Sequence, residues 1–276
     1  FFGRIPKRSL VWQISRRPKS VERIGNIEYH RVGDKKLYLD LYRSRKRLEK
    51  CPVLLWFHGG GWVLGGKRQQ GMPLVHHLAS LGWITISANY RFAPKIVLSE
   101  IVVDAKRALA WVRENVGDYG GDPEMIVLSG GSAGCHLASL LALSPNDPKL
   151  QPGFEKSDTS VQACVAMYGV YDLVDEKGLN FRGMRRFLER VVIRQKFEQA
   201  PELYRRLSPL HRISANAPPF LVVQGTLDTL APVAGARNFV KSYLDTAGQE
   251  LVYIELPHTQ HAFDVVHSPR TNAVVE

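Results

Sequence analysis

Short apolar runs alternate with amphipathic stretches along most of this chain. Continuous apolar runs, typical of strands that are covered on both faces, occur at 52–57, 83–88, 125–128, 161–167, 220–224 and 250–256. Between them, apolar residues recur at helical spacing over 135–143, 233–245 and 99–116, where Ser99 is the expected N-cap. Two alternating segments, 27–32 and 37–42, predict an antiparallel hairpin. The pattern therefore predicts an α/β fold with a mostly parallel, doubly wound sheet.

One segment, residues 172–213, breaks this alternation. It shows no strand pattern and is basic and helical, with apolar positions at Phe181, Phe187, Leu188, Phe197, Leu203 and Tyr204. Because it falls between two predicted strands, on the side to which strand carboxyl ends point, we expect a helical cap over the sheet edge. Residues 1–24 are also basic, and we expect them to pack across the main body as an arm or short helices. The whole chain, 1–276, is expected to form a single domain.

The turn SGGSAG at 129–134 lies between a predicted strand and a predicted helix. A Gly-x-Ser-x-Gly pattern at such a junction is typical of a nucleophile elbow. Its glycines permit a sharp turn that would hold Ser132 in a strained conformation above the sheet edge. The pattern alone is equally compatible with a glycine-rich turn that only solves a packing problem.

Acyl transfer by a serine also requires a base and an acid that orients it, in the chain order Ser, Asp or Glu, His. Asp228 follows the strand at 220–224 and is the preferred acid, although it also suits a turn. Asp172 is the alternative acid, and Asp264 is interpreted as a loop charge. For the base, we prefer His261 to His258, because an apolar residue two positions after His261 would anchor that loop.

The segment His58-Gly59-Gly60-Gly61-Trp62 follows the strand at 52–57 directly. Backbone amides can approach an oxyanion closely where no Cβ intervenes. We therefore predict that Gly60 and Gly61, together with Ala133 after the candidate nucleophile, form an oxyanion hole. His58 is expected to brace this loop, and His136 is expected to be packed on its helix rather than to act as the base. Arg91 and Asp104 are expected to form a structural brace nearby.

Taken together, these segments resemble the hormone-sensitive-lipase-like esterases of the α/β-hydrolase superfamily. The resemblance rests on the motifs HGGGW at 58–62, YRFAP at 90–94, GGSAG at 130–134, Asp228, and HAF at 261–263. It implies an α/β-hydrolase fold, hydrolysis of carboxylic esters through an acyl-enzyme, and a cap built from the arm at 1–24 and the insertion at 172–213. Two positions depart from the family: Gly131 replaces its common acidic residue, and no proline follows Asp228.

Two other functions remain open at this point. An amide hydrolase of the kynurenine-formamidase type carries a similar glycine-rich loop and small-residue elbow. A ligand-binding protein on the same scaffold typically lacks a member of the triad, whereas Ser132, Asp228 and His261 are all present here.

The composition, with 45% apolar and 23% charged residues, is ordinary for a globular protein. No run has the length of a transmembrane helix, and the start on Phe1 leaves room for a trimmed signal or membrane anchor, so the compartment stays undetermined. The three cysteines have no metal-ligand spacing, and no nucleotide-binding motif is present. We therefore expect no metal and no cofactor.

The net charge of +11 is concentrated in two segments, residues 1–50 with +10 and residues 176–212 with +6. No nucleic-acid-binding module accompanies these charges. They are compatible with solvated basic helices and also with peripheral contact to an anionic membrane. The expected partner is a small-molecule ester or lipid substrate, and the oligomeric state is undetermined.

Overall fold

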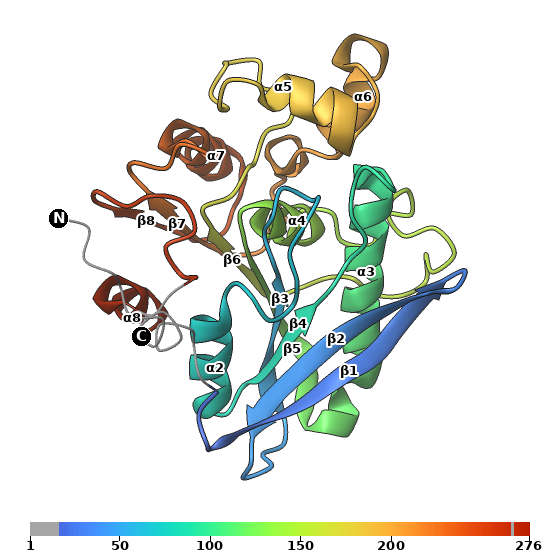
Figure 1. The fold of residues 1–276 in the computed structure, drawn as a ribbon, viewed down its shortest axis with the longest axis vertical. Helices are drawn as coiled ribbons and strands as arrows, with labels where there is room; N and C mark the ends of the chain where they lie inside the picture. Colours follow the sequence, from blue (N-terminus) through green and yellow to red (C-terminus); the bar gives the residue numbers. More distant parts are fainter. Residues whose placement is uncertain (1–16, 266–267) are drawn as a thin grey trace, which may run out of the picture.

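A computed structural model describes residues 17–265 and 268–276, and its centre is one eight-stranded sheet (Figure 1). The strand order is β1-β2-β4-β3-β5-β6-β7-β8, with β1, β2 and β4 paired antiparallel and the strands from β4 through β3 to β8 paired parallel. The strands are β1 (Val21–Val32), β2 (Lys35–Ser44), β3 (Cys51–Phe57), β4 (Ile84–Ala88), β5 (Gly121–Gly131), β6 (Ala163–Met167), β7 (Phe220–Gly225) and β8 (Leu251–Leu256). The predicted doubly wound sheet is confirmed.

Helices cover both faces of this sheet, as the two-sided burial of its strands requires. The main helices are α2 (Met72–Ser80), α3 (Leu98–Asn115), α4 (Ala133–Ala142), α7 (Val233–Thr246) and α8 (Pro269–Val275). Side chains of β3 alternate between two apolar cores, because successive residues of a strand point to opposite faces. Leu55 packs in the core that includes α3, α4 and α7, whereas Trp56 packs in the core that includes α2 and α8.

The predicted hairpin is present, but its first strand begins earlier than expected. β1 starts at Val21, so residues 21–24 belong to the sheet and not to an arm. Residues 1–16 of the predicted arm lie outside the described residues. Helix α3 begins at Leu98, because the Glu100 carboxylate accepts a hydrogen bond of 3.2 Å from the amide of Val97 and fixes the N-terminus there. Ser99 is therefore not the N-cap.

Residues 172–213 contain no strand, as predicted, and lie above the carboxyl ends of the parallel strands (Figure 1). Their short helical pieces are α5 (Met184–Phe187), η2 (Leu188–Val192), η3 (Phe197–Gln199), α6 (Pro201–Arg206) and η4 (Pro209–Arg212). The segment contacts the body through the imidazole Nε2 of His136 on α4, which donates a hydrogen bond of 2.7 Å to the carbonyl of Leu207. We call residues 172–213 the cap segment.

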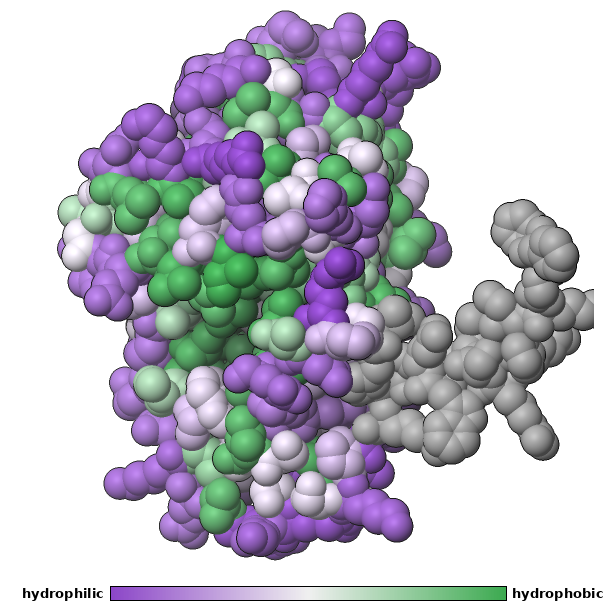
Figure 2. All heavy atoms as spheres, turned by 90° about the vertical axis from the view of Figure 1, so that its left-hand side faces the viewer, coloured by the Kyte–Doolittle hydropathy of each residue, from purple (hydrophilic) through white to green (hydrophobic). Residues whose placement is uncertain are grey.

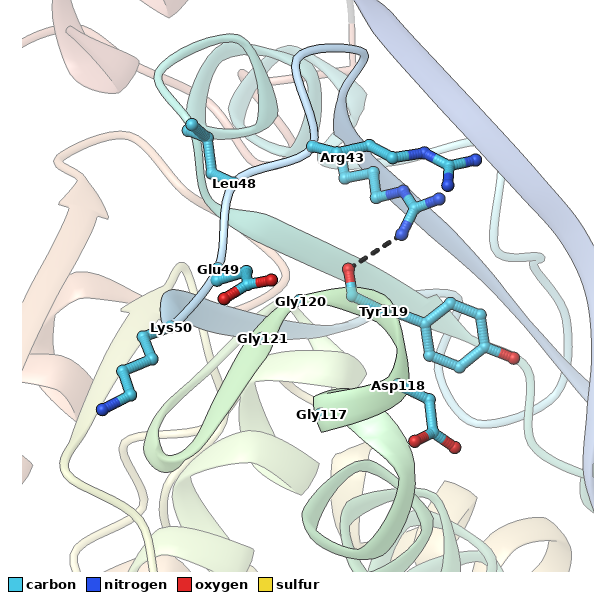
Figure 3. Close-up of a pocket in the computed structure, with 10 residues that line it drawn as sticks. Arg43, Leu48, Glu49, Lys50, Gly117, Asp118, Tyr119, Gly120 and Gly121 are labelled. Atoms are coloured by element: carbon cyan, nitrogen blue, oxygen red, sulfur yellow. Dashed lines mark hydrogen bonds between the residues drawn. The ribbon is translucent and has the colours of Figure 1, made fainter.

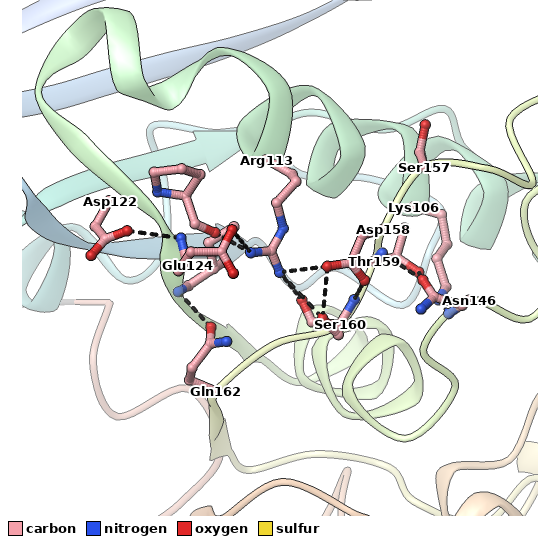
Figure 4. A network of polar contacts seen from close by, with 12 residues as sticks. Lys106, Arg113, Asp122, Glu124, Asn146, Ser157, Asp158, Thr159, Ser160 and Gln162 are labelled. Atoms are coloured by element: carbon pink, nitrogen blue, oxygen red, sulfur yellow. Dashed lines mark hydrogen bonds and ion pairs between the residues drawn. The ribbon is translucent and has the colours of Figure 1, made fainter.

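The connection between α4 and β6 is held by two cationic side chains of α3 (Figure 4). Arg113 donates to the carbonyls of Pro123 and Ser160 and thereby ties β5 to this connection. Lys106 is fully buried, where it donates to the carbonyl of Ser144 and, at 2.9 Å, to the hydroxyl of Thr159. Burial lowers the pKa of Lys106 to about 7.

Across the described ranges, no helix has the length and apolarity needed to cross a bilayer.

Candidate active site

The turn between β5 and α4 has the strained geometry that its glycines predict. Ser132 connects the two elements with φ 57° and ψ −121°, in a region that L-residues rarely occupy. A Cβ on Gly130 would collide with the backbone of Gly134, and a Cβ on Gly134 would collide with the carbonyl of Phe57. Small residues are therefore required on both sides of Ser132, so that α4 can pack directly against the end of β3.

The structure brings Ser132, His261 and Asp228 into one chain of hydrogen bonds. The Oγ of Ser132 lies 2.8 Å from Nε2 of His261, and Nδ1 of His261 lies 2.7 Å from Oδ2 of Asp228. Because an ionised carboxylate only accepts hydrogen bonds, Nδ1 carries the proton and Nε2 is left to accept the proton of Ser132. The Asp228 side chain is fully buried and that of His261 is 14% exposed.

Asp228 is oriented by its own turn as well as by the histidine. Its Oδ1 accepts hydrogen bonds from the amides of Leu230 at 2.9 Å and Ala231 at 2.8 Å. Its Oδ2 accepts a further bond of 3.0 Å from the side-chain amide of Gln224 on β7. Asp228 therefore does both things that the sequence suggested: it stabilises a turn, and it contacts His261.

The alternative acid and the alternative base do not reach Ser132. Asp172 lies 3.4 Å from the imidazole of His211 in the cap segment and also accepts from the amide of Val174. His258 has φ 51° in the turn that follows β8, where its amide donates to the hydroxyl of Thr226 at 2.9 Å. His258 thus belongs to the turn after β8 and not to the hydrogen-bonded set that contains Ser132 and His261.

The glycine loop after β3 lies against Ser132. A Cβ on Gly59 would come within 3.0 Å of the Ser132 Cβ. The amide of Gly59 is already used, because it donates to Oε1 of Gln70 at 2.7 Å. Within the described part of the chain, the amides of Gly60, Gly61 and Ala133 have no protein acceptor. These three N–H groups are therefore free to donate to a ligand.

His58 and His136 are structural, as expected from the sequence. The Nδ1 of His58 donates to the carbonyl of Gly59 at 2.8 Å, and the ring stacks on Tyr90 with centroids 4.3 Å apart. Burial lowers the pKa of both histidines to about 4, so both imidazoles are neutral at physiological pH. The loop that carries Tyr90 is in turn fixed by Arg91, whose guanidinium contacts both carboxylate oxygens of Asp104 at 2.8 Å.

Two residues next to the site were not identified from the sequence. Tyr168 follows β6 and is fully buried, with its ring edge-on to that of His261 at 5.0 Å between centroids. Asp264 lies in a loop, as expected, but it is only 1% exposed and is therefore not a solvated charge. Its burial raises the pKa of the carboxyl, and the hydrogen bond from the Tyr168 hydroxyl opposes that rise. The sequence offered two signals: Tyr168 follows a predicted strand, and Asp264 follows the candidate histidine. It could not reveal that these two side chains are in contact, because they are 96 residues apart.

Exposed leucines lie next to the candidate residues in the sequence, whereas a cleft elsewhere on the molecule is polar. Figure 2 shows hydrophobic side chains gathered around a hollow below the cap segment, on the face that carries α7 and β8. Exposed Leu227 and Leu230 flank Asp228, and exposed Leu64 follows the glycine loop. This polar cleft has a volume of about 420 Å³ and lies between residues 43–50 and 117–121, at the amino ends of β3 and β5 (Figure 3). It contains no serine, cysteine or histidine.

Known proteins similar to this chain include several esterases. A family model described as BD-FAE matches residues 39–243. The probable carboxylic ester hydrolase LipM of Mycobacterium tuberculosis (strain ATCC 25618 / H37Rv) is 47% identical over 89% of this chain and 57% of LipM. The isoprenylcysteine alpha-carbonyl methylesterase ICME of Arabidopsis thaliana is 29% identical over 73% of this chain and 48% of that protein. This chain therefore spans about half the length of these relatives.

Solved structures with the same fold include an esterase from Thermogutta terrifontis, Est2. Its native form has a TM-score of 0.76 and 25% identity, over 94% of this chain and 89% of that chain. The form phosphonylated by sarin has a TM-score of 0.75 and 25% identity, over 89% of this chain and 87% of that chain. The α/β-hydrolase fold expected from the sequence is thus confirmed.

Proposed function

This chain belongs to the BD-FAE family, among the hormone-sensitive-lipase-like esterases of the α/β-hydrolase superfamily, and we propose that it is a serine hydrolase of carboxylic esters. The observation that carries the proposal is the continuous chain of hydrogen bonds from Ser132 through His261 to Asp228. The family relationship supports ester hydrolysis in particular. The complete set of three side chains argues against a ligand-binding protein without activity.

In the proposed mechanism, the hydroxyl of Ser132 attacks the ester carbonyl while His261 accepts its proton at Nε2. Asp228 holds the imidazole in the required tautomer and stabilises the imidazolium that forms. The amides of Gly60, Gly61 and Ala133 donate hydrogen bonds to the oxyanion of the tetrahedral intermediate. His261 then donates the proton to the leaving alcohol. A water molecule, deprotonated by the same imidazole, hydrolyses the acyl-enzyme and regenerates Ser132.

The proposed substrates are apolar esters of small to medium size, including lipid esters. The support is the apolar surface around the site, where the exposed residues Leu64, Leu227 and Leu230 lie beside catalytic segments. The cap segment closes over the same region, because a Cβ on Gly61 would lie 3.7 Å from the ring of Phe187. An apolar acyl or alcohol group would bury hydrocarbon surface there, and that burial favours its binding over water.

Turnover of p-nitrophenyl butyrate by wild type and Ser132→Ala tests the proposed activity. We expect hydrolysis by wild type and a loss of at least about 10³-fold in kcat for the variant, because the nucleophile is removed. Ser139→Ala, which removes a buried hydroxyl of α4 that contacts the thiols of Cys135 and Cys164, is the matched control and should keep its activity. An aryl formamide assayed alongside separates the two chemistries. Faster turnover of the formamide would replace the ester proposal with that of an amide hydrolase.

We also propose that the basic cap segment promotes contact with an anionic membrane surface, which would deliver apolar esters to the site. Arg182, Arg186 and Arg190 of this segment are exposed, and such side chains are attracted to anionic headgroups. Sedimentation with anionic and with neutral vesicles measures this contact. We expect binding to anionic vesicles that weakens with salt, whereas equal binding to both vesicle types would exclude the electrostatic contact.

A further inference from the structure

A buried pair of side chains, Tyr168 and Asp264, lies behind the proposed base and has no part in the mechanism above. The hydroxyl of Tyr168 donates a hydrogen bond to Oδ1 of Asp264, three residues after His261. We propose that this pair positions His261 against Ser132, an inference that rests on the proposed function. Both are positioning residues, because neither lies where it would touch the reacting atoms.

The ring of Tyr168 restrains the one rotation that the hydrogen bonds leave free. Asp228 and Ser132 hold the two nitrogens of His261, so the imidazole can still turn about the line that joins them. The Tyr168 ring lies edge-on to the imidazole, at 5.0 Å between centroids and 73° between planes. It makes the same kind of contact, at 5.1 Å and 73°, with Phe263 on the same loop. Tyr168 therefore sets the tilt of the base.

Tyr168 is itself fixed to the elbow that carries the nucleophile. Its amide donates to the carbonyl of Val223 at 2.8 Å, and the preceding residue, Met167, accepts from the amide of Ser132 at 3.1 Å. A Cβ on Gly131 would collide with the Tyr168 hydroxyl. The absence of a side chain at Gly131, where the family commonly has an acidic residue, thus leaves the space that Tyr168 fills. The hydroxyl connects that space to a carboxylate on the histidine loop.

The histidine loop needs such a tie, because part of its backbone is in a disfavoured conformation. Ala262, directly after His261, has φ 56°, in the left-handed region that a residue with a Cβ rarely adopts. Backbone contacts hold the loop on either side, where Thr259 accepts from the amide of Leu227 and Phe263 accepts from the hydroxyl of Thr271. Directly after Phe263, the side chain of Asp264 anchors the loop to the end of β6.

The test is a double-mutant cycle with Tyr168→Phe and Asp264→Ala, read by kinetics on p-nitrophenyl butyrate. Each single variant should lose about 10- to 100-fold in kcat with little change in KM, because a small displacement of the base is costly. The double variant should lose no more than Asp264→Ala alone, because the hydrogen bond that Tyr168→Phe removes is also removed by Asp264→Ala, which in addition removes the contact of Asp264 with the amide of Gly71. Asp264→Asn keeps an acceptor for the Tyr168 hydroxyl and should restore most of kcat.

Tyr171→Phe is the matched control, because Tyr171 is also a buried tyrosine and its hydroxyl contacts Cys135 and not the histidine loop. A second readout, which needs no turnover, is the far-downfield proton resonance of the Nδ1–H of His261. It should broaden in Tyr168→Phe and Asp264→Ala but not in the control or in Asp264→Asn. Melting temperatures of all variants separate a shift of the base from general unfolding.

Losses that multiply in the double variant, or an unchanged kcat and resonance in Tyr168→Phe, would overturn the inference. Wild type without turnover would instead contradict the proposed function. A resonance that broadens in the Tyr168 and Asp264 variants would then still support the positioning of His261.

Discussion

The two halves of the candidate site are built in different ways. The nucleophile half, from β5 to α4, depends on nearby glycines and on direct contact with the end of β3. The histidine half, residues 257–264, is held by side chains that are distant in sequence, Asp228 and Tyr168. The first half is therefore encoded locally and tolerates no added volume. The second half depends on hydrogen bonds and ring contacts, so substitutions there should affect catalysis more than folding.

The largest effect is expected from Asp228→Asn in the histidine half. An amide at this position can donate to Nδ1 and so favours the wrong tautomer of His261. We expect kcat to fall by about 10⁴-fold, while the melting temperature changes little. Steady-state kinetics and thermal denaturation measure both. If activity is lost only because the variant unfolds at a lower temperature, substitutions in the histidine half affect folding as much as catalysis, which would contradict the comparison.

The next largest effect is expected from Gly134→Ala in the nucleophile half. The added Cβ would meet the backbone carbonyls of Phe57 and His58, which cannot move without distorting β3. We expect the free energy of unfolding to fall by about 3 kcal/mol or more, as measured by urea denaturation. Gly235→Ala on α7 is the control, because its Cβ meets nothing within 4 Å, and it should stabilise by about 0.5–1 kcal/mol. Equal effects of the two substitutions would refute the steric argument.

A pH-dependent effect is expected at the far end of α4, where Lys106 is buried. Its pKa in the folded protein is lowered to about 7, so the folded state releases a proton that the unfolded state retains up to about pH 10. Stability should therefore rise with pH from about 7 to 9, by up to about 1.4 kcal/mol per pH unit.

Urea denaturation across that range measures the rise, and Lys106→Met should abolish it. Lys241→Met, which changes a lysine that is 73% exposed, should leave the rise in place. A flat profile in wild type would contradict the lowered pKa of Lys106. The result would also show whether the stability of the segment behind the nucleophile half depends on pH.

The smallest effect is expected from Arg237→Ala, whose partner Glu255 lies just before the histidine half in the sequence. Arg237 on α7 forms an exposed bidentate pair with Glu255, near the end of β8, at 2.7 Å. Exposed ion pairs contribute little, so we expect kcat to be unchanged and the melting temperature to move by less than about 2 °C. A clear loss of kcat would mean that the histidine loop is positioned through β8 and not through Tyr168.

The sequence predicted the parts of the molecule in which short-range patterns decide the structure. Apolar periodicity identified the parallel strands and the main helices, and the glycines around Ser132 identified the strained turn. The strand before Asp228 and the apolar residue after His261 then favoured these two residues over Asp172 and His258, and their side chains lie within hydrogen-bonding distance in the structure.

The features that the sequence did not reveal depend on contacts between distant segments. The start of α3 at Leu98 is an exception, because the contact that sets it is local: the Glu100 carboxylate accepts a hydrogen bond from the amide of Val97, three residues earlier. The early start of β1 at Val21 follows from its pairing with the end of β2. Asp264 is buried because Tyr168, 96 residues earlier, offers it a hydroxyl. No local pattern distinguishes such a carboxylate from a solvated one.

The central claim is that Ser132 is a nucleophile activated by His261, and covalent labelling tests it most directly. The protein is treated with a p-nitrophenyl phosphonate, and its intact mass is measured for wild type, Ser132→Ala and the control Ser139→Ala. The account predicts one phosphonyl adduct on wild type and on the control, and none on Ser132→Ala. Folded wild type without an adduct, or an adduct that persists in Ser132→Ala, would contradict it.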